Sequence, residues 1–217
     1  YLLNQQGIYV HFSEDNILTD CKVAIRGPTG TPYEDGFLFF RVDFPLTYPF
    51  NSPKMTYISN TSTRIHPNFY VNGKCCLSIL GTWHGPSWTP AMNLISIVTT
   101  TQSLLTEHPI QNEPHYENQT GSISKKYNEI INYECITSLI NKRFLQLPSQ
   151  YECFEKFMVV HFHENKDRIY KRLKSIKKLE TGKIIRGPVY YSTIVPYYDT
   201  IKVGLNKVLA LSKQRYD

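Results

Sequence analysis

The most regular pattern of apolar and polar positions in this chain is an alternation over residues 37–44. The even-numbered positions there are all apolar, whereas the odd-numbered ones include Arg41 and Asp43, so the pattern predicts a strand with two unlike faces. Shorter runs predict further strands over residues 20–26 and 55–58. These strands lie close together in sequence and are joined by short turns, which favours an antiparallel meander.

Apolar positions spaced three and four residues apart replace this alternation after the third strand. Thr89 is a suitable N-cap and Pro90 suits a first helical turn, so we expect a helix that begins there and ends before His108-Pro109. Its expected apolar face consists of Ala91, Leu94, Ile95, Val98 and Leu105.

From Ser124 onward the pattern is mainly helical. One amphipathic stretch runs to Leu139, a second covers residues 154–176, and a last short helix is expected over residues 201–211. Residues 181–195 between them are irregular. The apolar stripe of the second stretch is too large to leave in water, so we expect this region to pack on the rest of the chain. That stripe includes Phe154, Phe157, Met158, Phe162 and Ile169.

Composition narrows the class of protein. Of 217 residues, 41% are hydrophobic, which suits a globular chain, and no apolar run reaches the roughly 20 residues of a membrane span. The opening residues lack a signal-peptide pattern, and five irregularly spaced cysteines favour free thiols in a reducing compartment. We therefore expect a cytoplasmic protein, with the nucleus left open as a second location. The net charge of +6 suits an acidic protein partner or nucleic acid.

The stretch from His66 to Leu80 holds the candidate chemistry. Its Asn-Gly pair predicts a tight turn, and two adjacent cysteines, Cys75 and Cys76, follow that turn. A thiol placed there can be presented at a surface groove, and the Asn68 amide is near enough in sequence to donate to a developing oxyanion. A thiolate nucleophile with an oxyanion donor is the minimum equipment for acyl transfer.

Five ordered sequence blocks resemble the ubiquitin-conjugating enzymes over roughly residues 7–117. The residues that carry the resemblance are Gly27-Pro28 with Thr31-Pro32-Tyr33-Glu34, the prolines of Tyr48-Pro49-Phe50-Asn51-Ser52-Pro53, His66-Pro67-Asn68, Gly73-Lys74-Cys75-Cys76-Leu77, and Trp88-Thr89-Pro90-Ala91. The Gly81-Thr82-Trp83 insertion, the Asn112-Glu113-Pro114 block and a helical C-terminal extension are most similar to the large Z-type members.

The resemblance implies an α+β fold: a four-stranded antiparallel meander flanked by helices. It implies a conjugating core over residues 1–117, with the family's first helix largely missing before it, and a helical extension over residues 118–217 packed on that core. Residues Tyr1 to Gln6 would then be the last turn of that first helix.

The chemistry implied by the resemblance is two successive acyl transfers. Ubiquitin or a ubiquitin-like protein would arrive from an activating enzyme as a thioester on Cys76 and pass to a substrate lysine, usually with a ubiquitin ligase. Asn68 would steady the oxyanion or the active-site loop, and Glu113 would orient or deprotonate the lysine. No metal or bound cofactor is implied, because ATP is used upstream by the activating enzyme. We expect neither a membrane nor a nucleic acid as a partner, since no aromatic-rich binding motif is present.

Each site residue also has a structural interpretation. Cys76 is also explained as a buried thiol, Asn68 as a turn residue that bonds its own backbone, and Glu113 as an ordinary solvated carboxylate. His66 is better explained as a hydrogen-bonded loop residue than as a base. The basic run over residues 171–186 is explained either as a solvated helix face or as a docking surface for an acidic partner.

Two other functions remain open from the sequence. One is a non-catalytic adaptor that binds ubiquitin or a ligase, although such adaptors typically lack the cysteine that this chain keeps. The other is a cysteine hydrolase, which needs a histidine base beside the thiol. Cys75 departs from the family pattern, because an aliphatic residue usually stands there. We expect Cys75 to face inward and Cys76 to share a groove with Asn68, so that Cys76 is alkylated first.

Overall fold

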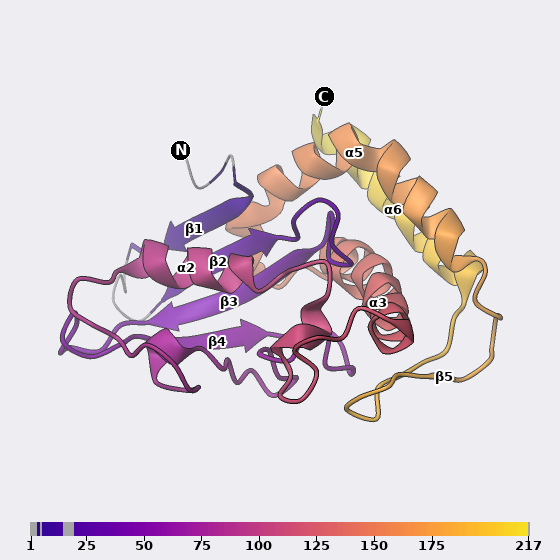
Figure 1. The fold of residues 1–217 in the computed structure, drawn as a ribbon. Helices are drawn as coiled ribbons and strands as arrows, with labels where there is room; N and C mark the ends of the chain where they lie inside the picture. The colour runs from indigo at the N-terminus through magenta and orange to yellow at the C-terminus, as the bar shows by residue number, and fades with distance from the viewer. Residues whose placement is uncertain (1–3, 5, 15–19, 217) are drawn as a thin grey trace.

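A single four-stranded sheet forms the centre of the molecule (Figure 1). The computed structural model describes residue 4, residues 6–14 and residues 20–216. The strands pair antiparallel in the order of the chain. Their bounds are β1 (Ile8–Phe12), β2 (Cys21–Arg26), β3 (Phe37–Asp43) and β4 (Lys54–Ile58). The predicted meander and α+β class are confirmed; β1 was expected only from the family resemblance.

Alternation along β3 separates two faces, as predicted, but each face joins a core of its own, and the second core was not expected. Leu38, Phe40 and Val42 join the large core on one face of the sheet, where α2 (Leu94–Ser103) contributes Ile97 and Val98. Phe37 and Phe39 point to the other face and join a smaller core there. The sheet is therefore buried on both sides, because opposite side chains of one strand each find a covering layer.

Helix α2 begins four residues later than we expected and ends earlier. Asn93, and not Thr89, is its N-cap: the Asn93 side chain accepts from the Ser96 backbone N–H at 3.2 Å, and the Ser96 hydroxyl bonds back. This capping box outweighs the helix-start signal of Pro90. The expected apolar face is also partly wrong, because Ile95 is 53% exposed and Ile97 is buried instead.

The second half of the chain is helical, as predicted (Figure 1). Helix α3 (Ser122–Glu134) continues without a break through a π-helical segment, η3 (Cys135–Lys142), and the short α4 (Arg143–Leu145). A 3-10 turn, η4 (Ser149–Phe154), leads into α5 (Glu155–Ile176), which packs beside α6 (Tyr198–Tyr216). Two further 3-10 turns, η1 (Ser78–Leu80) and η2 (Pro109–Asn112), precede α3.

The second face of the sheet is covered by η4 and the start of α5. Tyr151 stacks on Phe39 with ring centroids 4.6 Å apart and the planes 8° from parallel. Phe154 and Met158 complete this layer. Phe157, which we expected in the buried stripe, is 39% exposed and stacks on Tyr9 at the edge of the sheet. This packing places residues from the second half of the chain directly on the sheet.

A buried ion-pair network also joins α5 to the turn before β3. The Asp35 carboxylate lies 2.8 Å from His161 Nε2 and bonds Arg168. Burial alone would raise the pKa of Asp35, but the hydrogen bonds from His161 and Arg168 lower it to about 2. Asp35 is therefore charged at neutral pH, and its partners satisfy it.

Residues 181–195 are less irregular than we expected. They contain a two-stranded hairpin made of β5 (Ile185–Arg186) and β6 (Thr193–Ile194), which runs below α3 in Figure 1. The Tyr133 hydroxyl donates to the Val195 carbonyl at 2.9 Å and holds the hairpin's end against α3. We refer to residues 185–194 as the C-terminal hairpin.

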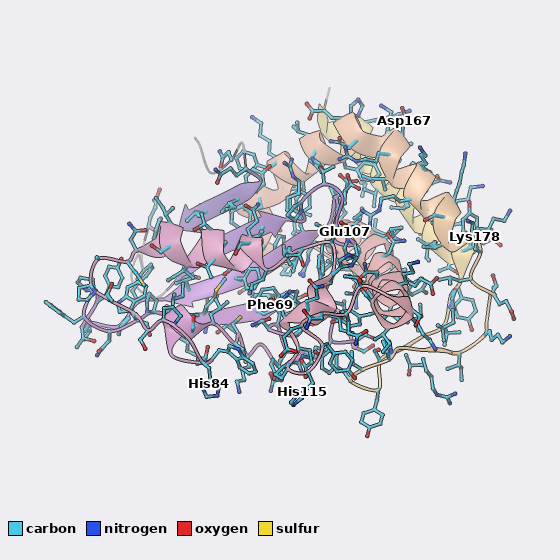
Figure 2. All side chains as sticks on the ribbon, in the orientation of Figure 1. Phe69, His84, Glu107, His115, Asp167 and Lys178 are labelled. Atoms are coloured by element: carbon cyan, nitrogen blue, oxygen red, sulfur yellow. The ribbon has the colours of Figure 1, made fainter. Side chains whose placement is uncertain are left out.

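Other expectations concern the surface and the N-terminus. Asp167 lies on the outer side of α5 and Lys178 lies just beyond its C-terminal end in Figure 2, and the lysines of the basic run are exposed. Most of the helical turn expected at Tyr1 to Gln6 lies outside the described residues. Within the part of the chain that the structure describes, no helix combines the length and apolar character needed to cross a bilayer.

Candidate active site

The His66-Pro67-Asn68 turn is held from inside by the His66 ring. Nδ1 accepts a hydrogen bond from the Asn68 backbone N–H at 3.0 Å, so Nε2 carries the proton and donates to the Leu104 carbonyl at 3.0 Å. Burial lowers the pKa of His66 to about 3. His66 is thus a neutral structural residue of the turn, which agrees with the loop interpretation and excludes it as the base of a thiol–imidazole pair in this conformation.

The segment that carries the two cysteines runs beside this turn. Phe69 pairs with Cys75 in an isolated antiparallel bridge, and the Cys76 N–H donates to the Asn68 carbonyl at 2.9 Å. Local extended pairing makes neighbouring side chains point to opposite sides. This is why two adjacent cysteines enter two different environments.

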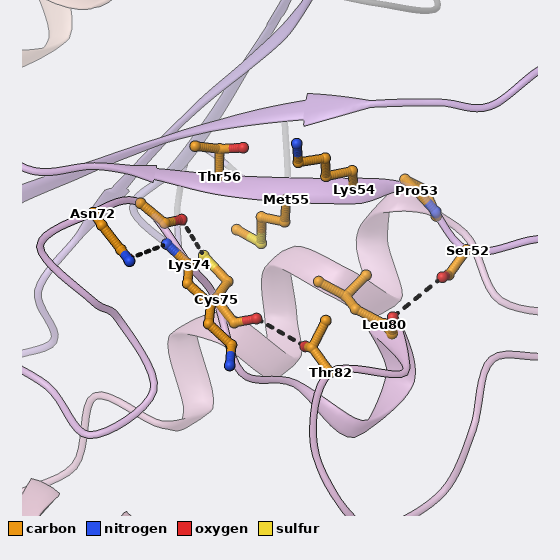
Figure 3. Close-up of a pocket in the computed structure, with 11 residues that line it drawn as sticks. Ser52, Pro53, Lys54, Met55, Thr56, Asn72, Lys74, Cys75, Leu80 and Thr82 are labelled. Atoms are coloured by element: carbon orange, nitrogen blue, oxygen red, sulfur yellow. Dashed lines mark hydrogen bonds between the residues drawn. The ribbon is translucent and has the colours of Figure 1, made fainter.

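Cys75 lies in the floor of a groove of about 470 Å³ beside β4 (Figure 3). Met55, Leu80 and Thr82 line the same groove. Burial raises the pKa of Cys75 to about 12, so its thiol stays protonated at neutral pH. Cys75 therefore packs as a small apolar side chain, in the inward orientation that we expected.

Cys76 lines a second groove, of about 320 Å³, together with Asn68 and Glu113. We call this the Cys76 groove. The three residues that the sequence singled out are therefore brought together, and Cys75 is not among them. Trp83 lines the Cys76 groove as well and is 42% exposed. Trp88 is an anchor, as expected, because its indole N–H donates to the Pro49 carbonyl at 2.6 Å.

The expected presentation of the Cys76 thiol at the surface is wrong for this conformation. Cys76 is only 1% exposed, whereas Cys153 is the single exposed cysteine of the five. The bridge at Cys75 and the bonds between Asn68 and Cys76 hold the segment against the turn. Alkylation of the free protein is therefore expected at Cys153 first, and not at Cys76.

The Asn68 side chain forms a hydrogen bond to the backbone of the segment that carries Cys76. Its amide Nδ2 donates to the Cys76 carbonyl at 2.6 Å, and its Oδ1 has no hydrogen-bond partner among the described atoms. An amide nitrogen has two hydrogens, so the second one is left for another acceptor. The arrangement supports a loop-steadying role directly and leaves a donor beside Cys76.

Thr82 braces the other side of the cysteine. Its hydroxyl donates to the Cys75 carbonyl at 2.8 Å and accepts from the Leu77 N–H at 2.9 Å. The Thr82 side chain therefore fixes the backbone of Cys75 and of Leu77, the residues on either side of Cys76. Sequence reasoning noted the Gly81-Thr82-Trp83 insertion only as a subfamily feature and missed this contact.

Glu113 does not match the interpretation of an ordinary solvated carboxylate. Its Oε2 accepts from the Tyr190 hydroxyl and lies 3.8 Å from Arg64 Nη2. Arg64 in turn contacts the rings of Tyr70 and Tyr190, at 3.6 and 4.1 Å from their centroids. Sequence reasoning missed Arg64 and Tyr190, because Tyr190 comes from a distant segment that showed no periodic pattern.

The described residues contain no group of three or more histidine, cysteine or acidic side chains placed to hold a metal ion. The buried His161 bonds Asp35.

Comparisons with known proteins identify the family to which the chain is similar. A sequence model of the family described as ubiquitin-conjugating enzyme matches residues 2–137. The chain is 48% identical over 122 residues to Ubiquitin-conjugating enzyme E2 Z of Xenopus tropicalis, which covers 55% of this chain and 39% of that protein. It is 35% identical over 176 residues to Probable ubiquitin-conjugating enzyme protein 17 of Caenorhabditis elegans, which covers 76% of this chain and 24% of that protein.

A solved structure also matches. Human ubiquitin-conjugating enzyme E2 G1 is 34% identical, with a TM-score of 0.40, and the match covers 48% of this chain and 85% of that one. The chain spans about two-fifths of the length of the Xenopus relative and about a quarter of the Caenorhabditis relative.

Proposed function

The chain belongs to the ubiquitin-conjugating enzyme family and is similar to its Z-type members, and on this basis we propose that it carries ubiquitin or a ubiquitin-like protein as a thioester on Cys76. The cargo comes from an activating enzyme and leaves to the amine of a substrate lysine, usually with a ubiquitin ligase. The observation that supports this most directly is that Cys76, Asn68 and Glu113 line one groove.

The reaction is two acyl exchanges at one carbonyl carbon. The Cys76 thiolate attacks the thioester that joins the cargo to the activating enzyme, and the thiolate of the activating enzyme leaves. The lysine nitrogen then attacks the new thioester, the Cys76 thiolate leaves, and the nitrogen loses a proton. Both steps pass through a tetrahedral oxyanion, to which the free hydrogen of the Asn68 amide is able to donate.

Glu113 suits the amine side of the second step. Its carboxylate lies on the wall of the Cys76 groove and is held by Tyr190 and Arg64. A fixed negative charge there attracts a lysine ammonium and receives the proton that the amine must lose. In this proposal residues 1–117 act as the catalytic core, and residues 118–217 act as an extension packed on it.

Two alternatives predict different behaviour. A non-catalytic adaptor would bind ubiquitin or a ligase without forming a covalent bond, and it would have no use for a thiol that shares a groove with the Asn68 amide. A cysteine hydrolase needs an imidazole base, whereas His66, the histidine of the same sequence stretch, is buried, neutral and occupied at both nitrogens. The conjugating activity therefore has the better support.

The test is to incubate the protein with ATP and a panel of activating enzymes, each with its ubiquitin-like protein. We expect at least one pair to yield an adduct that survives on a non-reducing gel and disappears on addition of a thiol. Absence of any adduct across a broad panel, together with direct binding of ubiquitin or a ligase, would favour the adaptor.

A further inference from the structure

The C-terminal hairpin reaches the Cys76 groove through one side chain. Tyr190, in the loop between β5 and β6, donates its hydroxyl to Glu113 Oε2 and lays its ring over the Arg64 guanidinium. Glu113 lines the Cys76 groove on one side and a groove of about 630 Å³ beside the hairpin loop on the other. A residue 77 positions from Glu113 in sequence therefore holds a carboxylate that lines the Cys76 groove, although Tyr190 itself lines only the groove beside the hairpin loop.

The hairpin loop is built to hold Tyr190 in an unusual conformation. Tyr190 and Tyr191 both have a left-handed backbone, with φ of 59° and 50°. Two consecutive bulky residues in this region are costly, and they persist only where the surroundings fix them. Here the Gly187 N–H donates to the Ser192 carbonyl at 2.8 Å, and a Cβ on Gly187 would collide with the Ser192 hydroxyl.

Further bonds fix the loop internally. The Ser192 hydroxyl donates to the Val189 carbonyl at 2.9 Å, and Ser192 is buried. The Thr63 hydroxyl is 3.4 Å from the Thr193 carbonyl and ties the hairpin to the segment that leads into the active-site turn. The loop is thus braced both within itself and against the rest of the molecule.

The two neighbouring tyrosines of the loop differ in their exposure to solvent. Tyr191 is fully exposed. Tyr190 packs edge-on against Tyr127, and burial raises the pKa of its phenol well above the usual value. Tyr190 therefore stays protonated and remains a hydrogen-bond donor throughout the range in which the enzyme would work.

Arg64 extends this contact to the turn that carries Asn68. Its guanidinium lies between the Tyr70 and Tyr190 rings, donates from Nε to the His66 carbonyl at 3.3 Å and also bonds the Pro67 carbonyl. One face of the guanidinium thus rests on the hairpin, while its edge holds two carbonyls of the turn. Cation–π contact and charge-assisted hydrogen bonds make this junction stiff.

We propose that Tyr190 is a positioning residue for the transfer of cargo to lysine, acting through Glu113 and through Arg64. The inference rests on the proposed function and adds to it that the C-terminal hairpin is part of the active site. By fixing the Glu113 carboxylate on the groove wall, Tyr190 sets the place where the attacking amine is held and loses its proton. Tyr190 itself touches neither the cargo nor the lysine.

The test compares Tyr190→Phe with Tyr191→Phe in single-turnover assays. Tyr190→Phe keeps the ring over Arg64 and removes only the hydroxyl, whereas Tyr191→Phe removes a hydroxyl that faces solvent one residue away. After charging, the activating enzyme is quenched and free lysine is added. We expect Tyr190→Phe to charge within about twofold of the parent and to discharge about tenfold more slowly, the scale of one hydrogen bond to a charged group. Tyr191→Phe should match the parent in both steps.

Two further readouts separate positioning from a general loss of structure. In a Glu113→Ala background, Tyr190→Phe should change discharge by no more than about twofold, because its effect passes through that carboxylate. Varying the lysine concentration should show a lower saturating rate with an unchanged half-saturating concentration. If Tyr190→Phe lowers charging and discharge equally, or acts fully in the Glu113→Ala background, the positioning role is wrong. A parent protein that never charges would instead refute the proposed function.

Discussion

Replacing Asn68 with alanine separates the two roles that its amide can have. In the resting protein Nδ2 donates to the Cys76 carbonyl at 2.6 Å, and both residues are buried. Alanine leaves that carbonyl without its side-chain donor, which costs about 1–3 kcal/mol of stability for a buried acceptor. This loss should appear in denaturant unfolding whichever role the amide has in catalysis.

The catalytic effect of Asn68→Ala is expected in addition to the loss of stability, and it falls mainly on the transfer of cargo to lysine. If the amide also donates to the oxyanion when lysine attacks, its removal costs about 3 kcal/mol of transition-state stabilisation, or on the order of a hundredfold in rate. Single-turnover discharge to free lysine should therefore slow by about that factor, while formation of the thioester, which the activating enzyme also assists, should fall much less.

A matched control is Asn72→Ala, in the neighbouring turn. The Asn72 side chain accepts from the Lys74 N–H at 3.2 Å but is exposed and lines the groove of Cys75 instead. It should alter stability slightly and leave discharge unchanged. If Asn68→Ala slows charging and discharge to the same extent, while losing stability, the amide acts only as a structural bond and the oxyanion role is refuted.

Two further predictions address the neighbouring thiol and the buried ion pair. Cys75→Val should leave thioester formation intact and change the free energy of unfolding by less than about 1.5 kcal/mol, because a buried, protonated thiol is replaced by a somewhat larger aliphatic side chain of the kind that the family usually has there; loss of charging in this variant would contradict the assignment. The Asp35 pKa is lower in the folded than in the unfolded protein, so the carboxylate adds stability above about pH 4, and that stability is lost as the pH falls toward about 2. Asp35→Asn should therefore lower the free energy of unfolding near pH 7, by about 2 kcal/mol for a shift of this size, and the difference from the parent should vanish by about pH 2; a difference independent of pH would contradict this.

The sheet was largely predictable because one strand alternated clearly. Residues 37–44 separate two faces in the sequence, and the structure buries those faces in two different cores. The strand β1 was not visible as a pattern, since its last two residues, His11 and Phe12, are exposed. The start of α2 was misplaced because a reciprocal side-chain cap at Asn93 is a matter of geometry, and Pro90, three residues earlier, gives a stronger signal in sequence.

The grouping of Cys76, Asn68 and Glu113 in one groove agrees with the sequence analysis, whereas the contacts around them were not predicted. Alternation in an extended segment was enough to place Cys75 and Cys76 on opposite sides, and the family blocks chose between them. Burial of Cys76 was not predictable, because it depends on bonds from Asn68 across eight residues of chain. The contact between Tyr190 and Glu113 was not predictable, because it depends on how a distant hairpin packs and not on any local sequence pattern.

The most direct test of the central claim is to identify the residue that carries the cargo. The protein is charged with ATP, an activating enzyme and its ubiquitin-like protein, and the adduct is digested without reduction and mapped by mass spectrometry. We predict one thiol-labile adduct on Cys76, its loss in Cys76→Ala, its persistence in Cys75→Val, and transfer of the cargo to added lysine. A thiol-labile adduct that persists in Cys76→Ala, or that maps to Cys75 or Cys153, would contradict the account.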